Sequence, residues 1–199
     1  MIISFEGGEG VGKSTHAKIL CAHLEQHGLP WLSFREPGGS PFSEDVRDLF
    51  FHEGLDTITE LLLILASRRE NITKMILPSI KQGKVVIIDR FIDSTLAYQG
   101  VLGGLGIGRV RKLMEKTDTW IEPDLTFVLD VDPGRALNRI VPGDKFELRE
   151  PVYHQRLRQA FLDLAVGARH RIIDGDRTRD QVSADILSAV DRELQLHGG

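Results

Sequence analysis

The sequence contains a single cysteine, Cys21, among its 199 residues, so an internal disulfide bond is excluded. This thiol lies in a helical pattern without a second metal ligand, which favours a small buried hydrophobe over a nucleophile. Long apolar runs are also missing, because the longest, residues 61–66, is much too short to cross a bilayer. No signal-peptide pattern precedes the first strand-like run. These absences predict a soluble, cytoplasmic protein.

An excess of positive charge is absent as well. The chain has 25 lysines and arginines against 29 aspartates and glutamates, a formal net charge of −4. A general nucleic-acid-binding surface is normally basic, so neither nucleic acid nor membrane is expected as a partner. A small anionic substrate stays possible, because a pocket can be locally positive on an acidic protein. No repeat or low-complexity linker divides the chain, which predicts one domain over residues 1–199.

Short apolar runs alternate with longer helical patterns along the chain. Several of these runs are continuously apolar, as expected for a parallel sheet covered on both faces. The alternation predicts an α/β fold, a three-layer α/β/α sandwich that binds ligands at the carboxyl ends of its strands. Strands are expected at 2–6, 29–34, 85–89, 125–131 and 171–175. Helices are expected at 13–27, 42–52, 57–82, 105–117, 133–140, 150–168 and 178–196, with Pro78 kinking or dividing the third.

A glycine-rich segment follows the first predicted strand and reads GGEGVGKST, with the Walker A spacing. Its glycines permit backbone conformations in which N–H groups converge on phosphate oxygens, and the following helix directs its N-terminus at the same anion. Lys13 adds a mobile positive charge, and the Ser14 hydroxyl is suited to Mg²⁺. The alternative is a glycine-rich turn that happens to contain a lysine, but the preceding strand and following helix favour nucleoside-triphosphate binding. The predicted ATP-binding residues are Gly7, Gly8, Glu9, Gly10, Val11, Gly12, Lys13, Ser14 and Thr15.

Two further segments follow strands and therefore point to the same edge of the sheet. REPGGS occupies residues 35–40 and leads to a helix with Arg47, whereas DRFIDSTLAYQG occupies residues 89–100. Asp89 closes an apolar strand and is a candidate Mg²⁺ ligand, directly or through water. Arg90 is suited to grip a phosphate bidentately. The alternative, a surface ion pair of little consequence, is disfavoured at the carboxyl end of a central strand.

These segments, FEGGEGVGKST, REPGGS, ASR and DRFIDSTLAYQG, resemble bacterial thymidylate kinases in their order and spacing. EPDLTFVLDVDP and FELREPVYHQRLRQAFLDLA are similar to the family's fourth strand and post-lid helix. The resemblance covers almost the whole chain. It implies a P-loop nucleoside-monophosphate kinase fold, transfer of the γ-phosphoryl group of ATP to dTMP, use of Mg²⁺ and a homodimer.

The resemblance also implies roles for individual residues. Arg47 and Arg90 match the arginines that hold the acceptor monophosphate, and Arg68 matches the arginine that hydrogen-bonds thymine. The other implied substrate residues are Glu36 at the acceptor phosphate and metal, Thr95 and Gln99 near the base, Tyr98 facing the deoxyribose and Glu9 near the 3′-hydroxyl. Ser94 is a further expected substrate-binding residue. These roles agree with elementary chemistry, because repulsion between two phosphorylated molecules is the main obstacle to transfer and cations with Mg²⁺ offset it.

The base pocket departs from the family pattern. The family usually stacks a phenylalanine on thymine, whereas the matching position in ELLLILASR is Ile64. An aliphatic side chain supplies apolar contact but not the geometry-specific aromatic contribution of about 0.5–1.5 kcal/mol. We therefore expect Arg68 and the surrounding packing to hold the base, with a weakened preference for thymine.

The segment RIVPGDKFELRE, residues 139–150, is the expected lid. Family members carry a catalytic arginine either in the P-loop or in the lid, and Gly10 after Glu9 points to the lid arrangement. Lys145 stands where arginine is usual, and a lysine neutralises phosphate without bridging two oxygens. Arg139 and Arg149 flank Lys145 and are candidates to take its place at the nucleotide. For each of the three cations, the alternative is a position on a solvated helix face. Pro142-Gly143 is a candidate flexible lead into the lid.

The predicted catalytic residues are thus Lys13, Arg90, Lys145 and Glu9, with Ser14 and Asp89 at Mg²⁺. Two other functions stay open. One is a related nucleoside-monophosphate kinase with a different or broader acceptor preference, which Ile64 permits. The other is a P-loop binding module with weak transfer, which the altered lid permits but the complete Walker A motif argues against.

Overall fold

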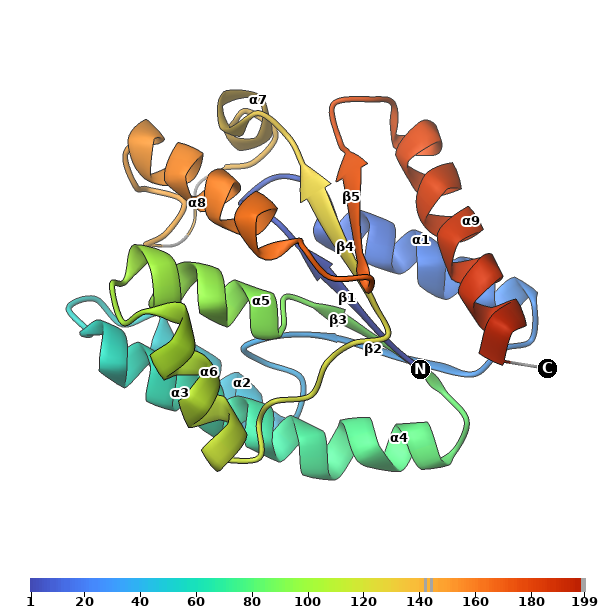
Figure 1. Cartoon of the computed structure of the whole chain (residues 1–199), viewed down its shortest axis with the longest axis horizontal. Helices are drawn as coiled ribbons and strands as arrows, with labels where there is room; N and C mark the ends of the chain where they lie inside the picture. The colour runs from blue at the N-terminus through green and yellow to red at the C-terminus, as the bar shows by residue number, and fades with distance from the viewer. Residues whose placement is uncertain (142, 144, 198–199) are drawn as a thin grey trace.

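The computed structural model describes residues 1–141, 143 and 145–197, and it contains a five-stranded parallel sheet (Figure 1). The strands are β1 (Ile2–Glu6), β2 (Trp31–Arg35), β3 (Val85–Asp89), β4 (Leu125–Asp130) and β5 (His170–Asp174). Their order is β2-β3-β1-β4-β5, and every pairing is parallel. After β1, the chain adds β2 and β3 on one side of β1, and it then adds β4 and β5 on the other side. Such a switch in direction is where open α/β sheets bind ligands.

Helices cover both faces of the sheet. α1 and α9 lie on one face, and the helices from α3 to α6, together with α8, lie on the other (Figure 1). The predicted three-layer α/β fold is therefore confirmed. The helical segments are α1 (Lys13–Gln26), α2 (Pro41–Phe50), α3 (Thr57–Asn71), η1 (Ile72–Ile76), α4 (Leu77–Lys81), α5 (Ile92–Thr95), η2 (Leu96–Leu102), α6 (Ile107–Lys116), α7 (Pro133–Leu137), α8 (Pro151–Leu164) and α9 (Arg179–His197).

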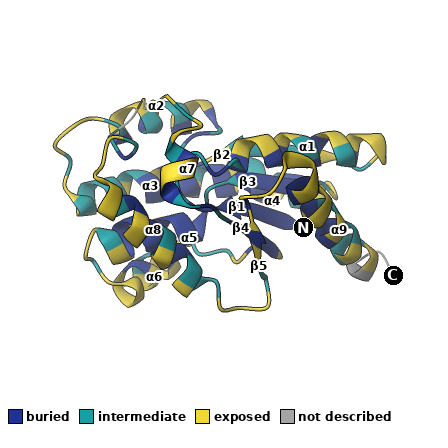
Figure 2. Ribbon diagram, turned by 90° about the horizontal axis from the view of Figure 1, so that it is seen from above, coloured by how far each residue is buried: buried dark blue, intermediate teal, exposed yellow. Residues whose placement is uncertain are grey.

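The core explains why the central strands are continuously apolar. Alternate β1 residues face opposite layers, with Ile3 and Phe5 packing under α1 and α9, and Ile2 packing under α3 and α6. Figure 2 shows the central strands buried between helices whose outward faces are exposed. A strand covered on both faces needs apolar residues at successive positions. None of the helices in the described part of the chain combines the length and apolar character needed to cross a membrane.

One helical stretch was not expected from the sequence. The segment 89–100 was expected to line the site after β3, and residues 92–102 form α5 and the π-helical η2. This stretch is buried along nearly its whole length, including the polar side chains of Asp93, Thr95 and Gln99. A helix covered on most sides loses the alternation of polar and apolar faces by which an amphipathic helix is recognised.

The predicted helix 57–82 is continuous but changes its winding. α3 ends at Asn71, the π-helical η1 follows, and Pro78 lies in the first turn of α4. Proline lacks the N–H that an interior helical hydrogen bond needs, and its ring displaces the carbonyl four residues earlier. The wider turn of η1 accommodates this carbonyl, so Pro78 divides the helix without ending it.

Candidate functional site

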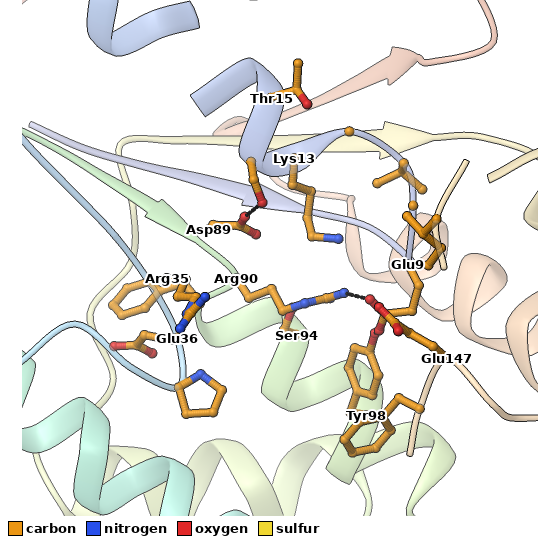
Figure 3. Close-up of a pocket in the computed structure, with 18 of the residues that line it drawn as sticks. Glu9, Lys13, Thr15, Arg35, Glu36, Asp89, Arg90, Ser94, Tyr98 and Glu147 are labelled. Atoms are coloured by element: carbon orange, nitrogen blue, oxygen red, sulfur yellow. Dashed lines mark hydrogen bonds and ion pairs between the residues drawn. The ribbon is translucent and has the colours of Figure 1, made fainter. Parts of the chain in front are cut away.

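A cleft of about 630 Å³ opens at the carboxyl ends of β1, β2 and β3. Figure 3 shows side chains from the P-loop and from the end of β3 directed into it. Gly7, Gly8, Lys145 and Arg149 are not part of its wall. The predicted residues that line the cleft are Glu9, Gly10, Val11, Gly12, Lys13, Ser14, Thr15, Glu36, Arg47, Ile64, Arg68, Asp89, Arg90, Ser94, Thr95, Tyr98, Gln99 and Arg139.

The P-loop depends on glycine where its backbone turns. Gly7 has a φ of +129°, and a Cβ at this position would lie 2.7 Å from the Leu129 carbonyl oxygen. Gly12 has a φ of +99° and caps the N-terminus of α1. Residues with a side chain rarely adopt these angles, so glycine is what lets the loop run closely beside β4. A loop of this kind is suited to binding phosphate through its N–H groups.

Lys13 lies folded over the loop from the first turn of α1. Its Nζ donates to the carbonyl oxygens of Gly8, at 2.5 Å, and Gly7, at 3.2 Å. Burial and the neighbouring Arg90 guanidinium lower the pKa of Lys13 to about 8, although Glu9 and Asp89 act in the opposite direction. The ammonium is thus a desolvated cation at the position where a polyphosphate would supply countercharge.

Ser14 and Asp89 meet at the same end of the sheet, and the Ser14 hydroxyl donates to the Asp89 carboxylate. No group of three histidine, cysteine or acidic side chains able to hold a metal occurs among residues 1–141, 143 and 145–197. This donor set fits Mg²⁺, which is commonly bound by one or two protein oxygens together with phosphates and water.

Arg90 connects the end of β3 to the P-loop. Its guanidinium donates to Glu9 Oε2 at 2.5 Å (Figure 3). It also donates to the Gly7 carbonyl oxygen at 2.9 Å. Tyr98 donates to the other Glu9 oxygen and lies under the guanidinium, 5.2 Å from ring centroid to Cζ. Burial opposes ionisation of Glu9, but Arg90 and Lys13 outweigh it and lower its pKa to about 2. The Arg90 backbone adopts a left-handed φ of +67°, uncommon outside glycine.

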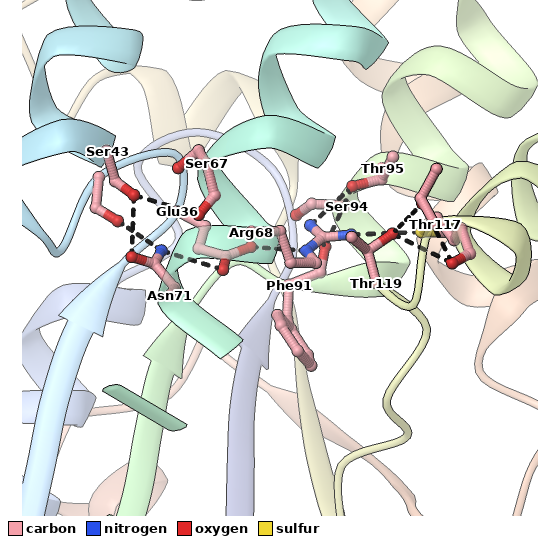
Figure 4. A network of polar contacts seen from close by, with 12 residues as sticks. Glu36, Ser43, Ser67, Arg68, Asn71, Phe91, Ser94, Thr95, Thr117 and Thr119 are labelled. Atoms are coloured by element: carbon pink, nitrogen blue, oxygen red, sulfur yellow. Dashed lines mark hydrogen bonds and ion pairs between the residues drawn. The ribbon is translucent and has the colours of Figure 1, made fainter. Parts of the chain in front are cut away.

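Arg68 is the centre of a buried polar network (Figure 4). It is 1% exposed, and it donates from Nε to Glu36 Oε2 at 2.7 Å and from NH2 to Thr95 Oγ1 at 2.9 Å. Asn71 holds the other Glu36 oxygen at 3.3 Å and the Gly38 carbonyl at 2.7 Å. Burial raises the pKa of Glu36, although the Arg68 charge acts in the opposite direction. The network fixes the loop after β2 against α3 and α5.

Ile64 and Arg47 lie near the other end of the cleft. Ile64 packs in an apolar cluster with Phe50, Tyr98 and Phe146, so aromatic rings surround the position at which the family carries one. Arg47 NH1 donates to the Pro37 carbonyl oxygen at 2.8 Å, and its Cζ lies 4.7 Å from the Phe51 ring centroid.

The lid cations have different neighbours. Lys145 Nζ contacts Glu60 Oε1 at 2.6 Å and the Phe50 carbonyl oxygen at 2.9 Å, so its ammonium is engaged with α3 and the end of α2. Arg139 lines the cleft with its NH2 3.7 Å from Asp176 Oδ1, and Arg149 lies over the Tyr153 ring at 5.7 Å. Pro142 and Asp144, part of the expected lid, lie outside the described residues.

Sequence reasoning missed several supporting residues. Glu6 accepts from the Phe91 N–H at 2.9 Å and from the Ser94 hydroxyl at 2.5 Å, and burial together with nearby Asp93 raises its pKa to about 7. Asp93 in turn accepts from Arg169 at 2.6 Å and contacts His170 at 2.9 Å. Glu6 had a visible signal, because a carboxylate within a continuously apolar strand needs a partner. The partners of Asp93 come from a distant strand, and no local pattern indicates them.

Comparison with known proteins agrees with this geometry. A family model described as thymidylate kinase matches residues 5–186. A thymidylate kinase of Symbiobacterium thermophilum is 39% identical over 201 residues, covering 98% of this chain and 94% of its own. A thymidylate kinase of Synechococcus sp. strain JA-3-3Ab is 41% identical over 197 residues, covering 98% and 97%. The crystal structure of an Ehrlichia chaffeensis thymidylate kinase superposes with a TM-score of 0.77 at 35% identity, covering 96% of this chain and 98% of its own.

Proposed function

Since the chain belongs to the thymidylate kinase family and therefore uses ATP to phosphorylate dTMP, we propose that the cleft is where the two nucleotides meet. The contact between Arg90 and the P-loop carries this proposal. It joins the arginine implied for the acceptor phosphate to the loop implied for the donor phosphates, through Glu9 and Gly7. Two anions brought together here would face Lys13 and Arg90, which offset their mutual repulsion.

On the donor side, we propose that the P-loop backbone from Gly7 to Thr15 and the N-terminus of α1 bind the ATP phosphates. Lys13 then exchanges its bonds to the Gly7 and Gly8 carbonyls for phosphate oxygens. Converging N–H groups and a buried cation are suited to a polyphosphate. Arg139 approaches the same nucleotide from the lid, and its position in the cleft wall supports that role.

On the acceptor side, Arg90 and Arg47 bind the monophosphate, with Glu36 close by. Glu9 holds Arg90 and accepts from the sugar 3′-hydroxyl, while Tyr98 packs on the deoxyribose. Fixed guanidinium forks restrict the angle at which a phosphate lies, which favours in-line transfer. The residues proposed at the base are Ile64, Arg68, Ser94, Thr95 and Gln99.

Ser14 and Asp89 are the residues proposed to hold Mg²⁺. Their paired oxygens lie beside Lys13, where the donor phosphates would supply further ligands. When bound, Mg²⁺ supplies charge neutralisation on the transferred phosphoryl group. For Lys145, a role at that group stays a prediction, because its ammonium is engaged with Glu60.

The proposal treats residues 1–199 as one cytoplasmic kinase domain with a short lid at about 139–150, acting as a homodimer. Apolar side chains exposed on α2 and α3 support a partner subunit, with Leu49 52% and Leu62 55% exposed. Light scattering on the purified chain tests the dimer, and a monomer mass at assay concentration would contradict it.

A coupled assay of ADP release with ATP and Mg²⁺, in the presence and absence of dTMP, tests the proposed site. We expect acceptor-dependent ADP from the wild type and at least about 100-fold less from Lys13→Ala. The same assay with dUMP and dGMP tests the effect of Ile64. We expect kcat/KM for dUMP to be about 10-fold lower than for dTMP, because uracil lacks the methyl group of thymine. We expect dGMP to be used much less, because its purine is larger than the base pocket for a pyrimidine. Equal use of all three nucleotides would refute thymidylate specificity.

A further inference from the structure

Gln99 is a buried amide at the cleft whose NH2 group makes a hydrogen bond and whose carbonyl oxygen makes none among the described residues. The side chain is 1% exposed, and its Nε2 donates to Glu60 Oε2 at 3.2 Å. Its Oε1 is buried without a hydrogen-bond partner among the described residues. A buried polar atom without a partner is costly, so this oxygen indicates a donor on a ligand that occupies the cleft.

The polarity of this amide is set by Glu60. An amide presents an acceptor on one side and donors on the other, and a half-turn about its last bond exchanges them. An ionised carboxylate accepts hydrogen bonds and does not donate them, so the NH2 group must face Glu60. The Gln99 carbonyl oxygen is then the group that is left to accept a hydrogen bond from a ligand in the cleft. Glu60 lies one turn before Ile64 on α3. Among the described residues, Gln99 is the one side chain of η2 that donates a hydrogen bond to Glu60.

Lys145 fixes Glu60 in turn. Its Nζ lies 2.6 Å from Glu60 Oε1, 2.9 Å from the Phe50 carbonyl oxygen and 3.4 Å from the His52 carbonyl oxygen. The three donors of an ammonium therefore have three acceptors. Both side chains of the ion pair are nearly buried, at 13% and 12% exposure, so solvent screens the pair weakly. A lysine suits this arrangement because its donors point in separate directions, whereas the donors of arginine lie in one plane.

We propose that Glu60 is a specificity-determining positioning residue that holds the Gln99 carbonyl oxygen toward the N3–H of the acceptor base, with Lys145 as its anchor. The inference rests on the proposed function, which puts the base beside Gln99. Thymine and uracil carry a hydrogen on N3, whereas N3 of cytosine is an acceptor. A fixed carbonyl oxygen therefore accepts from dTMP and meets a second acceptor in dCMP, which selects against dCMP.

The test is the ratio of kcat/KM for dTMP to that for dCMP. Glu60→Gln removes the constraint, because the new amide can donate or accept and Gln99 is free to turn. We expect the ratio to fall by about tenfold or more, through weaker use of dTMP and stronger use of dCMP. Glu115→Gln makes the same substitution in the exposed ion pair with Arg111 and should leave the ratio unchanged.

A double-mutant cycle separates this role from general destabilisation. Gln99→Met removes the amide, so adding Glu60→Gln to it should leave the ratio unaltered, whereas independent effects would multiply. Lys145→Met should also lower the ratio, by about threefold, because Glu60 loses its anchor. If Glu60→Gln reduces stability, the ratio measured on its folded fraction still reports the polarity of the amide.

The outcomes are distinguishable. An unchanged ratio in Glu60→Gln overturns the inference while the wild-type activity with dTMP stands. A loss of turnover in Lys145→Met with the ratio intact overturns the anchoring role and returns this ammonium to the transferred phosphate. A wild type without dTMP-dependent ADP release overturns both the proposed site and this inference.

Discussion

The Arg90 guanidinium and the Glu9 carboxylate form an ion pair with an N–O distance of 2.5 Å, and it joins the end of β3 to the P-loop. Both side chains are largely buried, and Glu9 and Asp89 keep the pKa of Arg90 above its ordinary value despite burial. The arginine is therefore oriented in advance for the acceptor phosphate that we propose it binds. Orientation in advance reduces the ordering that transfer requires.

The first prediction concerns the geometry of this arginine. Arg90→Lys keeps the charge but removes the planar fork that spans Glu9 and Gly7. We expect kcat/KM for dTMP to fall about 100-fold, with a much smaller change in ATP affinity. Steady-state kinetics and titration with a fluorescent ATP analogue measure the two quantities. Arg111→Lys, in an exposed ion pair, is the control, and equal losses in both variants would contradict a bidentate role.

The second prediction concerns Asp89, a proposed ligand of Mg²⁺. Asp89→Asn removes the negative charge but keeps an oxygen and the approximate shape. We expect the Mg²⁺ concentration for half-maximal activity to rise about tenfold, because a neutral amide is a weaker ligand for a hard cation. A Mg²⁺ titration of activity at fixed ATP measures it. Asp118→Asn, on the surface beside Arg69, should behave as the wild type. An unshifted titration in Asp89→Asn would remove Asp89 from the metal site.

The third prediction is a dependence on pH. Lys13 has a pKa lowered to about 8, so its ammonium is present below this pH and is lost as pH rises through it. The cationic form attracts phosphates, so kcat/KM for ATP should decline above about pH 8. At saturating ATP, kcat should decline at higher pH, because bound phosphates favour the charged ammonium. Rates from about pH 6.5 to about pH 9.5 test this, and a flat kcat/KM would contradict it.

The fourth prediction concerns stability. Glu36→Ala leaves the buried Arg68 guanidinium without its countercharge. We expect the free energy of unfolding to fall by about 3–5 kcal/mol, as is usual when one partner of a buried pair is removed. Urea denaturation measures the change. The exposed pair between Arg111 and Glu115 provides the control, since Glu115→Ala should cost less than about 1 kcal/mol. Similar losses in both variants would show that Arg68 is compensated by other groups.

The strands were the most predictable part of this fold. The predicted strands 2–6 and 85–89 match β1 and β3 in full, and the other three differ at their ends. A strand buried on both faces has a continuous apolar run in its sequence. Such a run can be recognised without knowing which strands or helices pack against it. The helix at 92–102 was missed because its buried polar side chains contact the site and conceal its periodicity.

The candidate site was predictable where the chain carries its own signal. Lys13, Ser14, Asp89 and Arg90 follow strand ends, and parallel strands bring those ends together. The position of Lys145 was not predictable in the same way. Its contacts with Glu60 and Phe50 span 85 and 95 residues of sequence, and no spacing rule relates such distant segments.

The anchoring of α5 has a consequence for engineering. Asp93 is hydrogen-bonded to Arg169 and His170 beside β5, and Ser94 is hydrogen-bonded to Glu6 of β1, so α5, which carries residues that we propose bind the acceptor, is fastened at two points of the sheet. Random substitutions there would mostly yield unfolded protein. A library intended to widen the range of accepted nucleotides should therefore vary the apolar lining at Ile64 and Phe50, and leave the polar network of Arg68 and Asn71 intact.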